Sequence, residues 1–302
     1  MTIFDFYQDF RQIGGGTVQD VVVVVNIGDS IAAAGGAELT SPDLNAGAHS
    51  RALIAYNSPV ARSIQPLAHI SGSRLGWWSH GPSFAQRLYE LTGLGTLWIT
   101  DLPQGGLSLR YEDNNAGNWD FRGTPSALTG NRLFLMDGSI NLDTVLPNTL
   151  NMIANGFPGF RVVHKHIHYL DGGTELASAY EAETVTDAEV IAAHVAMIDY
   201  FEDNWGFDKM FVAPCGFVGD DLVDLAADTR RFDLARAAQE AAIAADPRIF
   251  LGFGPGEAYG TLVTDGDGRW VSGWTKPDSS HPGPDEMVCL GIEFAHATAA
   301  AL

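Results

Sequence analysis

The chain has 302 residues, a formal net charge of −20 at pH 7 and a hydrophobic share of 46%. This hydrophobic content can bury a large core, which argues against intrinsic disorder. The acidic surface repels phosphate backbones, which argues against a nucleic-acid partner, and no apolar run reaches the ~18 residues that a transmembrane helix needs.

Nine segments predict regular structure along the chain. Apolar runs rich in β-branched or aromatic residues predict buried strands, and segments with helical periodicity or capping signals predict helices. In chain order they are a strand at 21–27 (VVVVVNI), a helix at 81–93, strands at 96–100 (TLWIT) and 160–170 (FRVVHKHIHYL), a helix at 186–205, a strand at 209–214, a helix at 228–247, a strand at 248–253 and a final helix at 283–302.

This alternation of strands and helices predicts an α/β fold with a doubly wound parallel sheet. Two stretches, 37–76 and 107–159, are rich in Gly, Asn, Ser and Pro and show weak periodicity, which indicates long loop insertions. No internal repeat or linker divides the chain, so we expect one domain over residues 1–302. In such sheets ligands bind beyond the carboxyl ends of the strands.

A serine follows the first predicted strand, in Gly28-Asp29-Ser30, and an acid–base pair stands near the C-terminus in Asp278-Ser-Ser-His281. A serine hydroxyl is a weak nucleophile and needs a histidine base, which in turn needs an acceptor to hold its tautomer. Ser30, His281 and Asp278 are therefore a predicted catalytic triad. The alternative is a helix-capping Ser30 and a surface turn at 278–282.

These two motifs, at the two ends of an α/β pattern, resemble those of the SGNH (GDSL) hydrolase family. In outline the chain is closest to the branch of sialate O-acetylesterase-like carbohydrate esterases. The resemblance implies a flavodoxin-like fold, a serine esterase activity and no cofactor or metal. It also implies an oxyanion hole in which the backbone N–H groups of Ser30 and Gly106, with Gly105 beside it, donate hydrogen bonds.

The chain departs from the family at the block after the third predicted strand, where the family has an Asn or Gln donor. Here the segment reads His168-Tyr-Leu-Asp171-Gly-Gly-Thr174. An ionised Asp cannot donate a hydrogen bond. Either Thr174 donates, or a loop asparagine (Asn114, Asn115 or Asn118) does, or the oxyanion hole has two donors.

Substrate contacts are expected from residues beside these blocks. They are Asp29, Gly105, His168, Asp171 and Trp274, the last by stacking on a sugar ring, although loop packing is the other interpretation for the tryptophan. His164, His166 and His168 alternate along one strand and so share a face. They are interpreted as packed or partly hydrated side chains, and a zinc site is the alternative.

Three functions are compatible with these observations. The first is a serine esterase that removes acyl groups, in particular acetyl, from a carbohydrate. The second is a carbohydrate-binding module of a phage-like or extracellular assembly with little or no catalysis, which the altered block motivates; a lipid esterase or thioesterase is a third, less favoured one. The N-terminal segment lacks the features of a signal peptide, and the sequence leaves the compartment and the oligomeric state open.

Overall fold

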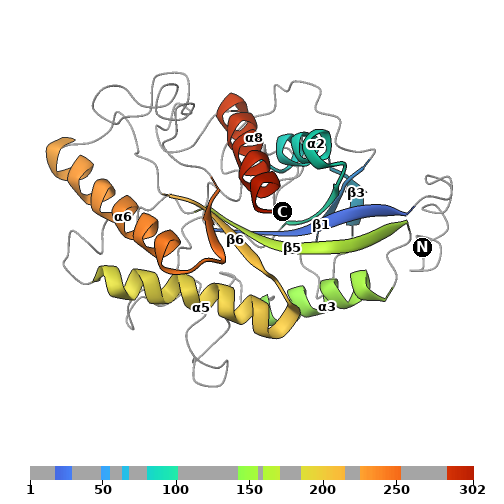
Figure 1. Ribbon diagram of the computed structural model, residues 1–302, viewed down its shortest axis with the longest axis horizontal. Coiled ribbons are helices and arrows are strands. Elements are labelled where there is room, and N and C mark those ends of the chain that lie inside the picture. The colour runs from blue at the N-terminus through green and yellow to red at the C-terminus, as the bar shows by residue number, and fades with distance from the viewer. Residues whose placement is uncertain are drawn as a thin grey trace.

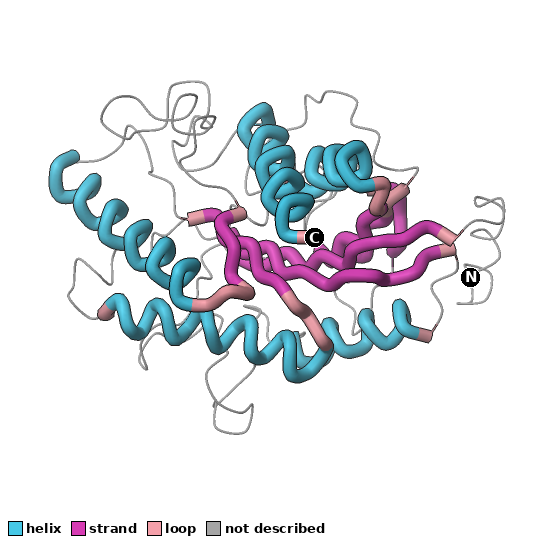
Figure 2. The backbone as a smooth tube through the Cα atoms, in the orientation of Figure 1, coloured by secondary structure: helices cyan, strands magenta, loops and turns pink. Residues whose placement is uncertain are grey.

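A seven-stranded sheet forms the middle of the protein, in the order β3-β2-β4-β1-β5-β6-β7. The computed structural model describes residues 18–28, 49–54, 63–67, 80–100, 142–155, 159–170, 185–214, 225–252 and 284–302. The strands are β1 (Gln19–Gly28), β2 (Arg51–Ile54), β3 (Ser63–Pro66), β4 (Gly95–Thr100), β5 (Phe160–Leu170), β6 (Lys209–Ala213) and β7 (Ile249–Leu251). Only the β2–β3 pairing is antiparallel among these strands. Figure 2 shows the strands between helices on either side.

The helices lie in two layers, one on each face of the sheet (Figure 1). The described helices are α2 (Gly81–Thr92), α3 (Leu142–Ala154), α5 (Asp187–Trp205), α6 (Leu225–Ala245) and α8 (Pro284–Ala301). Helices α3, α5 and α6 pack on one face, and α2 and α8 pack on the other. None of the helices in the described ranges is long and apolar enough to cross a membrane.

Strand β1 is central because both of its faces are buried. Val21, Val23 and Val25 contribute to the core under α3, α5 and α6, whereas Val22 and Val24 contribute to the core under α2 and α8. A strand that is covered on both sides reads as a continuous hydrophobic run rather than an alternating one. The run of five valines therefore specifies an interior strand of a parallel sheet.

The predicted doubly wound α/β sheet is confirmed. From β1 the chain builds β2, β3 and β4 on one side of the sheet, and then β5, β6 and β7 on the other. Helix α5 has Thr186 as its N-cap, and Glu189 completes a capping box.

The two stretches that were expected to be loop insertions contain regular structure as well. Strands β2 and β3 lie within 37–76, and α3 lies within 107–159. The two strands are only four residues long, too short for periodicity to show. Helix α3 contains Pro147, a residue that argues against a helix interior when only the sequence is read.

Helices α2 and α8 approach each other closely at Gly291. A methyl group on Gly291 would overlap Ser83 Oγ and the carbonyl oxygen of His80, and would lie 2.7 Å from the backbone nitrogen of Phe84. Two of these three atoms belong to the backbone at the start of α2, which cannot rotate away. The glycine is therefore required by the contact between the helices.

We expect Gly291→Ala to destabilise the protein. Alanine favours a helix interior by about 1 kcal/mol over glycine, but overpacking a core costs about 1–3 kcal/mol, and overlap with backbone atoms lies at the upper end of that range. The expected net loss is about 2 kcal/mol in the free energy of unfolding, measured by urea denaturation. Ala300→Ser, on an exposed position of the same helix, is the control and should change the free energy by less than about 0.5 kcal/mol.

Candidate functional site

The central strands of the sheet end together at one edge. Gly28, the last residue of β1, pairs with Leu170, the last residue of β5, and Leu170 pairs with Ala213, the last residue of β6. Strand β4 runs parallel to β1 on its other side and ends at Thr100. Segments that leave these four strands therefore start from a common edge.

This edge includes the point where the winding of the sheet reverses. The chain places β4 on one side of β1 and β5 on the other, so the connections diverge next to β1. Ligands of doubly wound sheets bind in the crevice outside the carboxyl ends at such a reversal. The carboxyl end of β1 is thus the position that the topology favours for a functional site.

Gly28 ends β1 in an unusual backbone conformation. Its φ is 146°, a value that residues with a Cβ rarely adopt. The strand therefore ends in a conformation that favours glycine, directly before Asp29 and Ser30. The glycine of the Gly-Asp-Ser motif therefore has a specific backbone requirement.

Most of the predicted site residues lie outside the described residues. They are Asp29, Ser30, Gly105, Gly106, Asp171, Thr174, Trp274, Asp278 and His281. Their positions along the chain relate them to described elements: Asp29 directly follows β1, Asp171 directly follows β5, and His281 stands shortly before α8. Their roles stay predictions.

His168 is the one predicted site residue whose side chain the structure describes, and it is fully buried. Its ring lies under α2 and α8, with centroids 4.6 Å from Phe84 and 4.5 Å from Phe294. Its Nδ1 atom lies 3.4 Å from Nε2 of His80, so one of the two nitrogens donates to the other. In this surrounding the imidazole packs as part of the core, and its contact with substrate stays a prediction.

Burial keeps these interior imidazoles neutral. It lowers the pKa of His80 to about 3, and it lowers the pKa of His168 well below the ordinary value, with a smaller contribution from neighbouring His80. A charged imidazole would have to give up its hydration without an acidic partner. His80 and His168 therefore form a neutral pair inside the α2–α8 layer.

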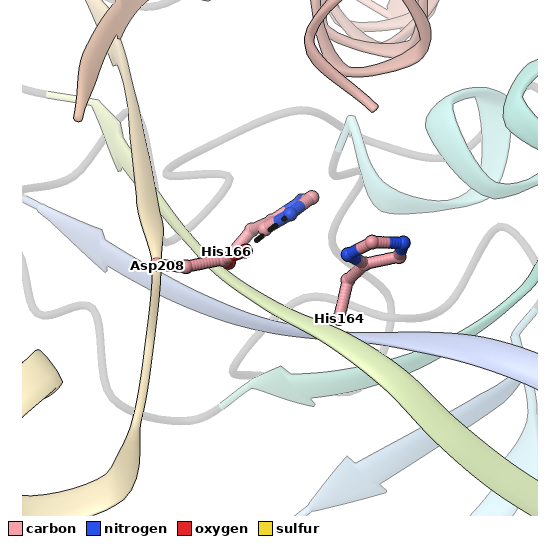
Figure 3. A group of neighbouring side chains, drawn as sticks. All are labelled: His164, His166 and Asp208. Carbon is pink, nitrogen blue, oxygen red and sulfur yellow. Dashed lines mark ion pairs between the residues drawn. The ribbon is translucent and has the colours of Figure 1, made fainter. Parts of the chain in front are cut away.

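The three alternating histidines of β5 do not act as one group. His166 is buried and lies next to half-buried His164, but the nearest carboxylate comes from Asp208, just before β6 (Figure 3). Burial also lowers the pKa of His166 to about 3, partly offset by the charge of Asp208. Asp208 was missed in the sequence because only the pairing of β5 with β6 brings it to His166.

No protein-family model and no curated protein matches the chain. Solved structures are similar in fold. The crystal structure of NanS has a TM-score of 0.47 at 12% identity, with 94% of this chain and 97% of that chain covered. A protein from Arabidopsis thaliana has a TM-score of 0.49 at 11% identity, covering 92% and 98%. A member of the lipolytic protein G-D-S-L family from Veillonella parvula has a TM-score of 0.36 at 10% identity, covering 93% and 100%. Because none of these scores reaches 0.5, we draw no functional conclusion from them.

The neutral His80 makes the stability of the protein depend on pH. Its pKa is about 3 in the folded state against 6.5 for an exposed histidine, so its contribution is complete above pH 6.5 and is lost as the pH falls towards 3. Between pH 7.5 and pH 5 this loss is about 2 kcal/mol. We expect His80→Phe to reduce the drop in unfolding free energy over this interval by about that amount, measured by urea denaturation at both pH values.

Phe84→Leu is the matched control, because it removes another neighbour of His168 without removing a titratable group. It should lower the free energy of unfolding equally at pH 7.5 and pH 5. An unchanged pH dependence in His80→Phe would show that His80 does not titrate on unfolding as the structure implies.

Proposed function

We propose that the protein is a serine esterase that uses Ser30 as nucleophile, His281 as base and Asp278 as the residue that orients the base. The observation that carries the proposal is the end of β1. The central strand of the sheet ends at the reversal of its winding, in a glycine with φ 146°, and Asp29 and Ser30 follow at once. A serine that directly follows the central strand at this edge would face a ligand bound in the crevice outside the carboxyl ends.

The described histidines support His281 as the base, because none of them has a suitable environment. His80, His166, His168 and His194 are fully buried. His49 stacks flat on Tyr89, with centroids 3.5 Å apart, and His296 accepts a hydrogen bond from Arg87. His164 lies half-buried on β5, six residues before the end of the strand. Of the nine histidines, His69 and His281 remain, and only His281 has an aspartate three residues before it.

The proposed reaction is a two-step acyl transfer. His281 accepts the proton of the Ser30 hydroxyl while Oγ attacks the ester carbonyl, and the protonated imidazole then donates that proton to the departing alcohol. In the second step water attacks the acyl-enzyme, with His281 again accepting and then donating the proton, and the carboxylic acid is released. Asp278 accepts a hydrogen bond from the other ring nitrogen and holds the tautomer that leaves one nitrogen free as base.

The tetrahedral intermediate needs donors for its oxyanion. The proposed donors are the backbone N–H groups of Ser30 and Gly106, one after β1 and one after the neighbouring β4. Asp171 follows β5, the other neighbour of β1, and as an ion it cannot donate, so Thr174 is the proposed third donor. This substitution of a hydroxyl for an amide is the feature that most distinguishes the proposed site.

We propose an acetylated carbohydrate as the substrate class. Asp29, Gly105, Asp171 and Trp274 are the proposed contacts, with the tryptophan stacking on a sugar ring. The altered segment after β5 favours a second function, carbohydrate binding with little turnover, because loss of an oxyanion donor lowers the rate by about 10²–10³. Both functions place the sugar at the carboxyl edge of the sheet.

Ser30→Ala is expected to lower kcat for a small acetyl ester by at least about 10³-fold, because the covalent route is lost. Asp278→Asn should lower kcat by a comparable factor, because the asparagine would hold His281 in the wrong tautomer. Ser279→Ala, in the same segment as Asp278, is the control and should keep the wild-type rate. Full activity in Ser30→Ala would refute the assignment of the nucleophile.

A series of esters with acyl chains of increasing length tests the substrate class. We expect kcat/KM to be highest for acetyl and to fall with each added methylene, because a site for short acyl groups has no apolar groove to bury them. The same preparation should be titrated with acetylated and unmodified glycans. Glycan binding without turnover in the wild type would favour the binding module, whereas a preference for long chains would favour a lipid esterase.

A further inference from the structure

Two histidines and an aspartate converge on one side of the sheet, away from the carboxyl edge. The side chains of His164 and His166 lie on the same face of β5. Asp208, the residue directly before β6, lies beside them (Figure 3). One ligand atom from each of the three residues lies within 4.8 Å of the other two. The rings of His164 and His166 have their centroids 5.7 Å apart.

His166 is the unusual member of this group, because it is fully buried. Within the described ranges neither Nδ1 nor Nε2 has a hydrogen-bond partner. Its nearest polar contact is Oδ1 of Asp208, 3.6 Å from Nε2, which is too long for a hydrogen bond. Buried polar atoms are almost always satisfied, so an orphaned pair of nitrogens calls for a ligand.

The donor set and the spacing suit a divalent transition metal. Two imidazoles and a carboxylate are ligands of Zn²⁺. Ligand atoms about 2.0–2.1 Å from a tetrahedral zinc are about 3.3 Å from one another, close to the separation of His166 and Asp208. His164 is half-buried, and one of its ring nitrogens lies within 4.8 Å of the ligand atoms of the other two residues.

The surroundings leave the site accessible to an ion. The side chain of Asp208 is 49% exposed, so a metal can enter from solvent. Lys209 contacts Oδ2 of Asp208 at 3.2 Å and leaves Oδ1 directed to His166. Because the lysine chain is flexible, its ammonium can move into solvent when a cation binds. A water molecule would complete four-fold coordination.

We propose that His164, His166 and Asp208 bind one Zn²⁺ ion. The site is separate from the proposed esterase site, because His166 stands four residues before the carboxyl end of β5, or about 13 Å along the strand. A zinc ion there would join β5 to the segment that enters β6. The proposal is independent of the esterase function, since none of its ligands belongs to the proposed catalytic residues.

The experiment is a titration of the metal-free protein with Zn²⁺. Calorimetry measures the affinity and the number of ions bound, and the thermal midpoint of unfolding is measured with and without Zn²⁺. We expect one ion per chain and a higher thermal midpoint, because a ligand that binds only the folded state stabilises it. His164→Ala and Asp208→Asn should each weaken the affinity by at least about 10-fold. Both residues are partly exposed, so these variants should fold.

The matched controls remove a histidine and an aspartate outside the proposed zinc site. His296→Ala and Asp203→Asn, both at exposed positions, should keep the wild-type affinity. Titration with Co²⁺ gives a second measurement, in which intense visible absorption is expected for tetrahedral coordination in the wild type and not in His164→Ala. The proposal is overturned if the wild type binds no Zn²⁺. It is also overturned if His164→Ala and Asp208→Asn bind Zn²⁺ with the same affinity as the control variants.

Discussion

The structure depends on the burial of β1, a strand without a polar face. Val21 to Val25 are all fully buried, and each apolar side chain removed from water contributes about 1.5–3 kcal/mol as an upper estimate. Neither face of such a strand can meet water, so both must be covered by helices. Layers on both faces in turn require crossover connections between parallel strands, which is the doubly wound arrangement.

The same constraint sets the position of the candidate site. In a parallel sheet all carboxyl ends meet one edge, and here β1, β5 and β6 end in register at Gly28, Leu170 and Ala213. The core is thus built by the strands and helices, while the segments after the strands are free to carry reactive groups. Gly28 is the boundary between the core and these segments, because it ends the strand in an unusual backbone conformation two residues before Ser30.

The α2–α8 face of the sheet buries the imidazoles of His80, His166 and His168. His80 and His168 form a neutral pair among aromatic rings, and close packing of α2 on α8 at Gly291 shields them. His166 lies on the same face but faces Asp208 instead of another ring nitrogen. Identical side chains two residues apart on one strand therefore have different chemistry, because different elements cover them.

The sequence by itself determined the long elements and the class of fold, because β1, β5, α2, α5 and α8 have strong local patterns of valine runs, caps and helical periodicity. It also placed Ser30 after a strand and His281 before a helix. Strands β2 and β3 and helix α3 were missed, since short or proline-containing elements depend on neighbours that stabilise them. Only the tertiary structure decided that His168 pairs with His80 and that Asp208 lies beside His166, because strand register and helix packing bring together residues that no local pattern connects.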